Sequence, residues 1–255
     1  MRVVLAAARF QADLLRRTPA ELTALITVPL YTLALLSIIK HAGRDDLAPY
    51  AVLGATVIAL WSMAIRVAGS MIDSDRYAGR LELLIAAPTP LPGIILGRCV
   101  TVTVISLLSI AESVVVARLA FGIGVTVPHL GLFIATLAAA VVAMAGTCTA
   151  IAGVFVLARS ARIFQNSLSY PFYLLSGAVV PVALLPGWLQ PVSKVVFLSW
   201  VTDLVRDCLR AAPVPNAAPR LLAVLTLGAL GYAGGGWMLT RIVGRVRATG
   251  AVSYS

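Results

Sequence analysis

The residue patterns of common catalytic and nucleotide-binding sites are missing from this sequence. There is no G-x-x-x-x-G-K-[ST] motif, and neither lysine, Lys40 nor Lys194, follows a glycine-rich loop, so no P-loop binds ATP here. His41 and His129 are isolated, and neither HExxH nor GxSxG occurs, which counts against an intramembrane protease or a lipase. We therefore expect a chain that is not an enzyme and that binds no metal or cofactor itself.

Two ionisable side chains, Glu112 and Arg66, fall inside long apolar runs. A charge near the centre of a bilayer costs at least about 2.5–3.5 kcal/mol on insertion scales, so such residues usually have a partner or a function. Arg66 is expected near the cytoplasmic end of its run, where its long side chain reaches the membrane surface. Glu112 is expected to pair with Arg118 or to face a cavity. Together, Glu112 and Arg66 are a candidate intramembrane polar site.

The composition indicates that a bilayer surrounds these runs. Of the 255 residues, 60% are hydrophobic and only 12% are charged, with a mean hydropathy of +0.97. Soluble domains are roughly 45–50% apolar and about 25% charged. The net charge of +10 does not indicate nucleic-acid binding, because the arginines stand singly at the ends of apolar runs, where they set topology and meet lipid headgroups.

The sequence predicts one all-α integral membrane domain over residues 1–255. A span needs roughly 20 apolar residues, and about six runs qualify: 22–39, 47–65 with an apolar continuation to 72, 94–117, 130–157, 164–184 and 221–240. The last run is rich in glycine, at Gly228, Gly231 and 234–236. Small residues at this spacing let helices approach closely, so we expect a packing face there.

The distribution of arginine predicts that both termini are cytoplasmic. With that orientation the cytoplasmic segments, including the tail 241–255, hold most of the basic residues, and the two short outer loops hold only Lys40, Arg44 and Arg118.

Residues 1–18 are expected to form an amphipathic helix lying in the membrane interface. Arg2, Arg9, Asp13 and Arg16 share one helical face, and an apolar stripe forms another. That stripe consists of Val3, Ala7, Phe10 and Leu14. The alternative is a simple polar cap on the first span.

The connection between the second and third spans, residues 73–90, combines charges with leucines. Gly79 can end the preceding helix, and Pro88 and Pro90 can stop the next one. We expect a short cytoplasmic helix that docks in a groove of another protein, with leucines as anchors and charges at the rim. The candidate docking residues are Asp75, Arg76, Gly79, Leu81, Glu82, Leu84 and Ile85. The alternative is a solvated loop with a few exposed leucines.

The segment 177–212, between the fifth and sixth spans, contains too many prolines for one continuous helix. We expect broken helices that re-enter the membrane from outside, since freed backbone groups need a protein or aqueous environment there. Asp203–Arg206 and Asp207–Arg210 are predicted i, i+3 pairs. The candidate outer-gate residues are Pro181, Pro186, Trp188, Asp203 and Arg206. The alternative is the charged face of a helix in an outer loop.

Three of these elements together resemble the permease subunits of type-2 ABC exporters, the family that includes daunorubicin-resistance and polysaccharide-export permeases. They are the N-terminal amphipathic helix, GRLELLIAAP within 73–90, which is similar to a Gly-x-Leu-Glu-x-Leu-x-x-x-Pro pattern, and LLSGAVVPVALLPGWLQPVSK, which is similar to a Ser-Gly…Pro…Leu-Pro-x-Trp-Leu stretch.

The resemblance implies a role for each element. Residues 73–90 would be a coupling helix seated in a separate ATP-binding cassette subunit, 1–18 a connecting helix, and 177–212 an outer gate. A second permease copy or a paralogous permease would complete the transporter in the bacterial inner membrane, surrounded by membrane lipids. ATP and magnesium would be bound by the partner subunit.

For the cargo we expect a small amphiphilic compound, drug or lipid-like molecule, because the short outer loops leave no room for a substrate-binding ectodomain. Two alternatives stay open. One is export of a glycan or lipid-linked polymer by the same family, against which the low aromatic content of 7% argues. The other is an ion-coupled secondary transporter using Glu112, although no internal repeat supports it.

Overall fold

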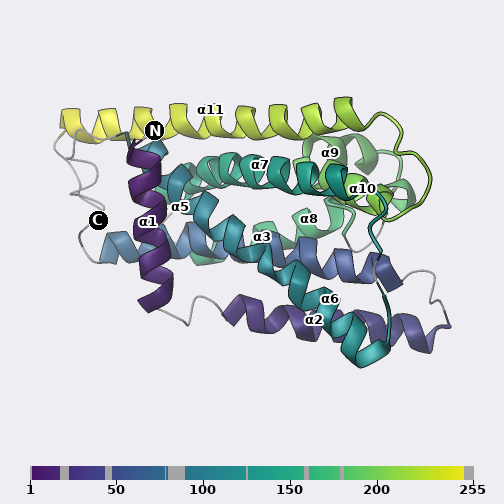
Figure 1. Ribbon diagram of the computed structural model, residues 1–255. Coiled ribbons are helices and arrows are strands. Elements are labelled where there is room, and N and C mark those ends of the chain that lie inside the picture. The colour runs from purple at the N-terminus through teal and green to yellow at the C-terminus, as the bar shows by residue number, and fades with distance from the viewer. Residues whose placement is uncertain are drawn as a thin grey trace.

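The computed structural model describes residues 2–17, 23–43, 48–77, 79, 90–124, 126–157, 161–178 and 181–249. Every regular element in these ranges is helical (Figure 1). The elements are α1 (Arg2–Arg17), α2 (Thr23–His41), α3 (Ala48–Tyr77), α5 (Leu91–Ser106), α6 (Leu108–Phe121), α7 (Leu130–Leu157), α8 (Ala161–Leu175), η3 (Val182–Leu184), α9 (Leu189–Val195), α10 (Phe197–Cys208) and α11 (Ala217–Thr249).

Four helical stretches in the described part of the chain are long and apolar enough to cross a membrane. They are Val52–Asp75, Leu91–Phe121, Leu130–Val156 and Ala217–Arg245. Helix α2 adds a shorter apolar stretch, Val28–His41. These stretches lie on the predicted spans one to four and six, and the total of six spans stays a prediction.

The predicted fifth span, 164–184, is not one continuous helix. Helix α8 has 15 residues and ends at Leu175, which corresponds to roughly 22 Å at 1.5 Å per residue, less than the hydrocarbon core of about 30 Å. The chain then turns at Gly177, whose φ of 71° is in the left-handed region that favours glycine.

Helix α3 lies at the centre of the bundle and is its most enclosed helix. Its apolar stretch is 82% buried within the chain, and it contacts α2, α5, α6, α7, α8 and α10. Trp61 of α3 is stacked on Phe172 of α8, with ring centroids 4.0 Å apart and planes 8° from parallel. Such a helix can shift only if its neighbours shift with it, because packed interiors transmit displacement.

The third predicted span is one apolar stretch with a break at Leu107, where α5 ends and α6 begins. Around this break the hydroxyls of Thr103, Ser106 and Ser109 donate to the carbonyls of Cys99, Thr103 and Ser106 at 2.8, 2.8 and 2.6 Å. Hydroxyl bonds of this kind compete with the backbone ladder and bend helices.

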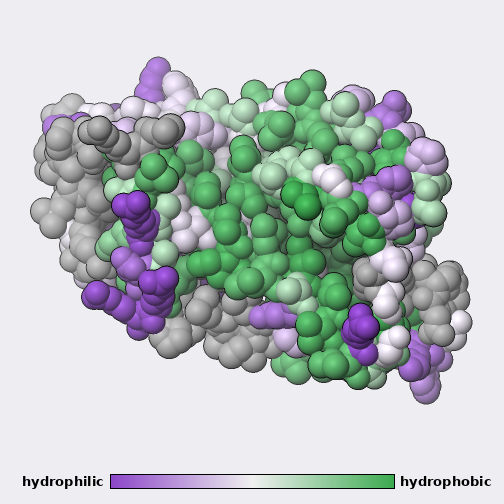
Figure 2. Space-filling model, viewed as in Figure 1, coloured by the Kyte–Doolittle hydropathy of each residue, from purple (hydrophilic) through white to green (hydrophobic). Residues whose placement is uncertain are grey.

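The two ends of the bundle differ. Helix α1 crosses the other helices at the end where α3 finishes, α5 starts and α11 finishes, whereas α9 and α10 lie at the opposite end (Figure 1). In the view of Figure 2, hydrophobic residues form a broad band between more hydrophilic ends. Large apolar side chains such as Leu119, Leu230 and Ile38 are 81, 68 and 65% exposed, as expected where lipid replaces water as the solvent.

Helices α7 and α11 pack closely through glycines, as the composition of the last span predicts. A Cβ atom added at Gly228 would lie 2.4 Å from the Cα of Ala143, and one added at Gly235 would lie 2.5 Å from the Cα of Ala150. Gly234, by contrast, has open space around it.

We expect Gly228→Ala to destabilise the chain, because the added methyl group meets backbone atoms that cannot move aside. The cost should be about 1–3 kcal/mol, as for overpacked cores, and thermal unfolding of the detergent-purified protein measures it. Gly234→Ala is the matched control, since it makes the same change in the same helix without a contact. Equal unfolding temperatures for the two variants would contradict this packing.

Candidate functional site

A buried ion pair joins the end of α3 to the start of α5. The Arg98 Nη1 atom lies 2.7 Å from Asp75 Oδ2, with side chains only 4 and 6% exposed. The Arg98 Nε atom donates to Gln11 Oε1 of α1 at 2.8 Å, and the guanidinium carbon lies 5.5 Å from the centroid of the Phe10 ring. One cation thereby connects three helices. We call Gln11, Asp75 and Arg98 the cytoplasmic junction; the names cytoplasmic and outer for the two ends of the bundle follow the predicted orientation.

Helix α1 can approach Arg98 because the neighbouring residue of α5, Gly97, has no side chain. A Cβ atom added at Gly97 would lie 2.3 Å from the carbonyl oxygen of Val4 and 3.1 Å from the Cβ of Ala7. One turn along α5, the Thr101 hydroxyl donates to the Ala8 carbonyl at 3.1 Å. The backbones of the two helices are therefore nearly in contact.

The amphipathic character of α1 is present, but its buried face differs from the predicted stripe. The side chains turned toward the bundle are Ala7, Gln11 and Leu15, at 8, 1 and 2% exposure, whereas Phe10 is 49% exposed. Arg9, Asp13, Arg16 and Arg17 are exposed. The predicted apolar stripe of Val3, Ala7, Phe10 and Leu14 is wrong at Phe10. The buried position belongs to Gln11, a polar residue that accepts a hydrogen bond from Arg98.

The structure corrects the expected position of Asp75. We expected this carboxylate at the rim of a docking surface, but it is buried inside the chain, because it neutralises Arg98. Arg76 lies in the last turn of α3, and Gly79 has a φ of 65°, consistent with its expected role as a helix breaker. The remaining candidate docking residues, Leu81, Glu82, Leu84 and Ile85, lie outside the described residues.

The outer segment is divided into the short helices η3, α9 and α10, as its prolines predict. Pro181 and Pro186 are exposed, and Trp188 is 73% exposed. These three candidate gate residues lie on the surface near the outer end, away from the buried polar contacts of α10. Their re-entry into the membrane stays a prediction.

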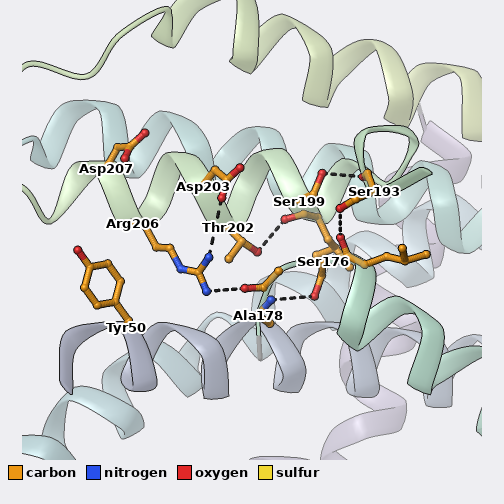
Figure 3. Close-up of polar contacts among 12 residues, drawn as sticks. Tyr50, Ser176, Ala178, Ser193, Ser199, Thr202, Asp203, Arg206 and Asp207 are labelled. Carbon is orange, nitrogen blue, oxygen red and sulfur yellow. Dashed lines mark hydrogen bonds and ion pairs between the residues drawn. The ribbon is translucent and has the colours of Figure 1, made fainter. Parts of the chain in front are cut away.

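Helix α10 is fixed to the turn that follows α8 (Figure 3). The guanidinium of Arg206, only 8% exposed, donates to the carbonyl of Gly177 and lies 3.8 Å from Asp203 Oδ1. Ser193 of α9 donates to the carbonyl of Leu175, and Ser199 donates to the carbonyl of Ser193 at 2.8 Å. We call these contacts the outer clamp.

Further ionic contacts extend the outer clamp to α11 and α3. Asp207 lies 2.7 Å from Arg220 Nη1 of α11 and 3.7 Å from Arg210 Nη1, and Arg210 Nε donates to the Tyr50 hydroxyl of α3 at 3.1 Å. Burial raises the pKa of Asp203 above the usual aspartate value, although the guanidiniums of Arg206 and Arg220 act in the opposite direction. Both predicted i, i+3 pairs are present, but the shorter contact to Arg220 was not predictable from local spacing.

Glu112 and Arg66 are not brought together. One carboxylate oxygen of Glu112, Oε2, is buried without a hydrogen-bond partner in the described part of the chain, and no ion pair joins Glu112 to Arg118 there. Arg66, on α3, is exposed. Beside Glu112, the Ser113 hydroxyl accepts from Thr32 of α2 at 3.0 Å and from Thr56 of α3 at 3.5 Å, a buried hydroxyl cluster that the sequence reading missed.

Arg66 instead belongs to a polar and aromatic surface inside the apolar part of the bundle. Tyr173 of α8 lies close to the side chains of Ser62 and Ser169 and within electrostatic range of Tyr31 and Arg66. Tyr170 is 75% exposed and meets Tyr173 edge to face, with centroids 6.4 Å apart. We call this set, namely Tyr31, Ser62, Arg66, Ser169, Tyr170 and Tyr173, the intramembrane face.

The sequence did contain a signal for the intramembrane face. Gln165, Ser169 and Tyr173 recur every four residues within a stretch that we interpreted as a plain apolar span. Polar positions at this spacing form one face of a helix, and in a membrane such a face is turned toward protein or a water-filled cavity.

Comparison with known proteins agrees with this architecture. The family model of the ABC-2 type transporters matches residues 3–209, which include α1, the cytoplasmic junction, the intramembrane face and most of the outer clamp. No curated protein matches the chain. Because the match covers most of the sequence, the chain belongs to the ABC-2 type transporter family, as a membrane permease component that works with an ATP-binding cassette component.

Proposed function

We propose that this permease exports a small amphiphilic molecule, drug or lipid-like compound, and that the intramembrane face is the surface along which the cargo passes. The observation that carries the proposal is the exposure of Arg66 within an apolar stretch that is 82% buried. A cation left against lipid would be costly, so Arg66 needs a polar surrounding that a second permease copy and a cargo together would supply.

The chemistry of the intramembrane face suits an amphiphile. Tyrosines present an apolar ring with a polar tip, and Tyr31 and Tyr170 are 52 and 75% exposed. Arg66 is the cation of the set, and none of the six residues is acidic. We therefore favour a cargo with an apolar or aromatic body and an anionic group. A glycan or lipid-linked polymer is the second candidate, favoured by the same tyrosines.

We further propose that residues 73–90 seat in the ATP-binding cassette subunit and that both termini are cytoplasmic. The gathering of α1, the cytoplasmic junction and the C-terminal end of α11 at one end of the bundle supports this (Figure 1). ATP binding would close the partner subunits, and the coupling segment would pass that movement to the spans as a rigid-body shift. ATP and magnesium would stay in the partner, and a second permease copy would complete the pathway in the bacterial inner membrane.

The buried position of Asp75 specifies how this transmission would work. Asp75 lies in the first part of the coupling segment 73–90, and Arg98 binds it to α5 while Gln11 binds the same arginine to α1. A displacement of the coupling segment would then move α1, α3 and α5 together. Asp75 acts in this scheme as an internal anchor and does not contact the ATPase.

Leu84→Asp should abolish ATPase activity that depends on the permease, because a charge replaces an apolar anchor of the docking helix. The chain is co-expressed with candidate ATP-binding cassette subunits, purified by its own tag, and assayed for co-purification and ATP hydrolysis. The matched control is Leu184→Asp, the same change at a residue that is 73% exposed near the outer end.

Unchanged ATPase activity in Leu84→Asp would overturn the coupling assignment. Purification of the chain without any ATPase subunit, with transport driven by a proton gradient and lost in Glu112→Gln, would instead establish the ion-coupled alternative.

Arg66→Gln should weaken the response to anionic cargo. With aromatic sulfonates as probes, the concentration that gives half-maximal stimulation of the ATPase should rise roughly tenfold, as expected for loss of a charged hydrogen bond. Cationic probes and Arg9→Gln, an exposed arginine on α1, serve as controls. Equal responses of Arg66→Gln and the unaltered chain would refute the assignment of the intramembrane face, and stimulation by oligosaccharides alone would favour the glycan cargo.

A further inference from the structure

The C-terminal part of α11 carries a shallow groove that the transport scheme does not use. The groove has a volume of about 520 Å³ and is lined by Trp237, Thr240, Arg241, Gly244 and Arg245. Trp237, Arg241 and Arg245 are spaced four residues apart, so they form one stripe along the helix. Gly244 leaves the floor of the groove open, since nothing lies within 4 Å of a Cβ atom added there.

The guanidinium of Arg241 in this groove is held over an aromatic ring. The Arg241 guanidinium carbon lies 5.0 Å from the centroid of the Trp237 ring, and Trp237 is 64% exposed. Among the described residues Arg241 forms no ion pair, and the lining of the groove contains no acidic residue. The ring orients the guanidinium through a cation–π contact without neutralising it.

A second groove at the outer end provides an internal comparison. It has a volume of about 440 Å³ and is lined by Trp200, Pro215, Asn216, Pro219 and Arg220. There the arginine is neutralised, because Arg220 Nη1 lies 2.7 Å from Asp207 Oδ2. An aromatic residue and an arginine occur in both grooves, but only the groove at Arg241 keeps its charge available to an anion.

The position of the groove along α11 indicates which anion it meets. Trp237 lies in the last third of the candidate span Ala217–Arg245, and tryptophan is enriched at the membrane–water boundary. Arg241 and Arg245 follow roughly 6 and 12 Å further along, at 1.5 Å per residue. The headgroup layer on each side of the hydrocarbon core is about 5–8 Å thick, so with Trp237 at the boundary Arg241 would lie at the depth of lipid phosphates.

We infer that the groove of Trp237, Arg241 and Arg245 binds the phosphate of an anionic phospholipid in the leaflet next to α1. Arg241 contacts the phosphate, and Trp237 lies against the upper acyl chains. The inference depends on insertion of α11 into a membrane and not on the cargo or on the coupling segment.

The test is titration of the detergent-purified full chain with phosphatidylglycerol and, separately, phosphatidylcholine, with bound lipid counted by native mass spectrometry. Arg241→Gln should weaken phosphatidylglycerol binding roughly fivefold, and Trp237→Leu about two- to fivefold. Arg241→Lys should keep most of the affinity. Arg118→Gln removes the same charge from the far end of α6 and should leave binding unchanged.

Three results would overturn the site: equal binding of the two lipids, an equal loss in Arg118→Gln, or displacement of the lipid by millimolar inorganic phosphate. The last result would show a general phosphate site. Thermal unfolding without added lipid confirms that each variant is folded. If Arg241→Gln does not fold, the comparison of Arg241→Lys with Trp237→Leu replaces it: the site requires phosphatidylglycerol binding to be kept in the first variant and weakened in the second.

Discussion

Arg98 is a permanently charged side chain held out of solvent at the point where three helices meet, and this end of the permease is organised around its neutralisation. Removing two ions from water costs several kcal/mol each, and only close geometry with further hydrogen bonds offsets that cost. Asp75 supplies the counter-charge and Gln11 the remaining acceptor. Because α3 and α5 each contribute one charge and α1 a neutral acceptor, separating α3 from α5 would break the buried ion pair, and moving α1 away would remove a hydrogen bond from Arg98.

The outer end follows the same rule with different partners. Arg206 is buried against the carbonyl of Gly177 and beside Asp203, so the helix α10 and the turn after α8 form one unit. Between the two ends the described contacts include the close α7–α11 packing and the hydroxyl cluster around Ser113. A bundle that is fixed by buried cations at both ends favours movement of whole helices over local bending.

Hydropathy predicted most of the long helices because it is a property of contiguous residues. The broken outer segment was predictable for the same reason, from its prolines. What the sequence reading missed depends on contacts between distant segments. Asp75 and Arg98 are 23 residues apart, and nothing in the local pattern of 73–90 distinguishes a buried acid from one at a docking rim. Gln11 looked like a polar interruption of an amphipathic face, and its role becomes visible only when α5 is placed against α1. The helix α8 was read as apolar because its polar face is diluted by leucine and phenylalanine.

The most direct test of this account is amide hydrogen exchange over α1 in Asp75→Asn. If the cytoplasmic junction holds α1 in place, the amides of Arg2–Arg17 should exchange at least about tenfold faster than in the unaltered chain, while those of α7 stay protected. Asp13→Asn is the matched control, because Asp13 forms only an exposed pair with Arg16 at 4.0 Å. Unchanged exchange in α1, or an equal increase in Asp13→Asn, would show that the buried ion pair does not hold these helices together.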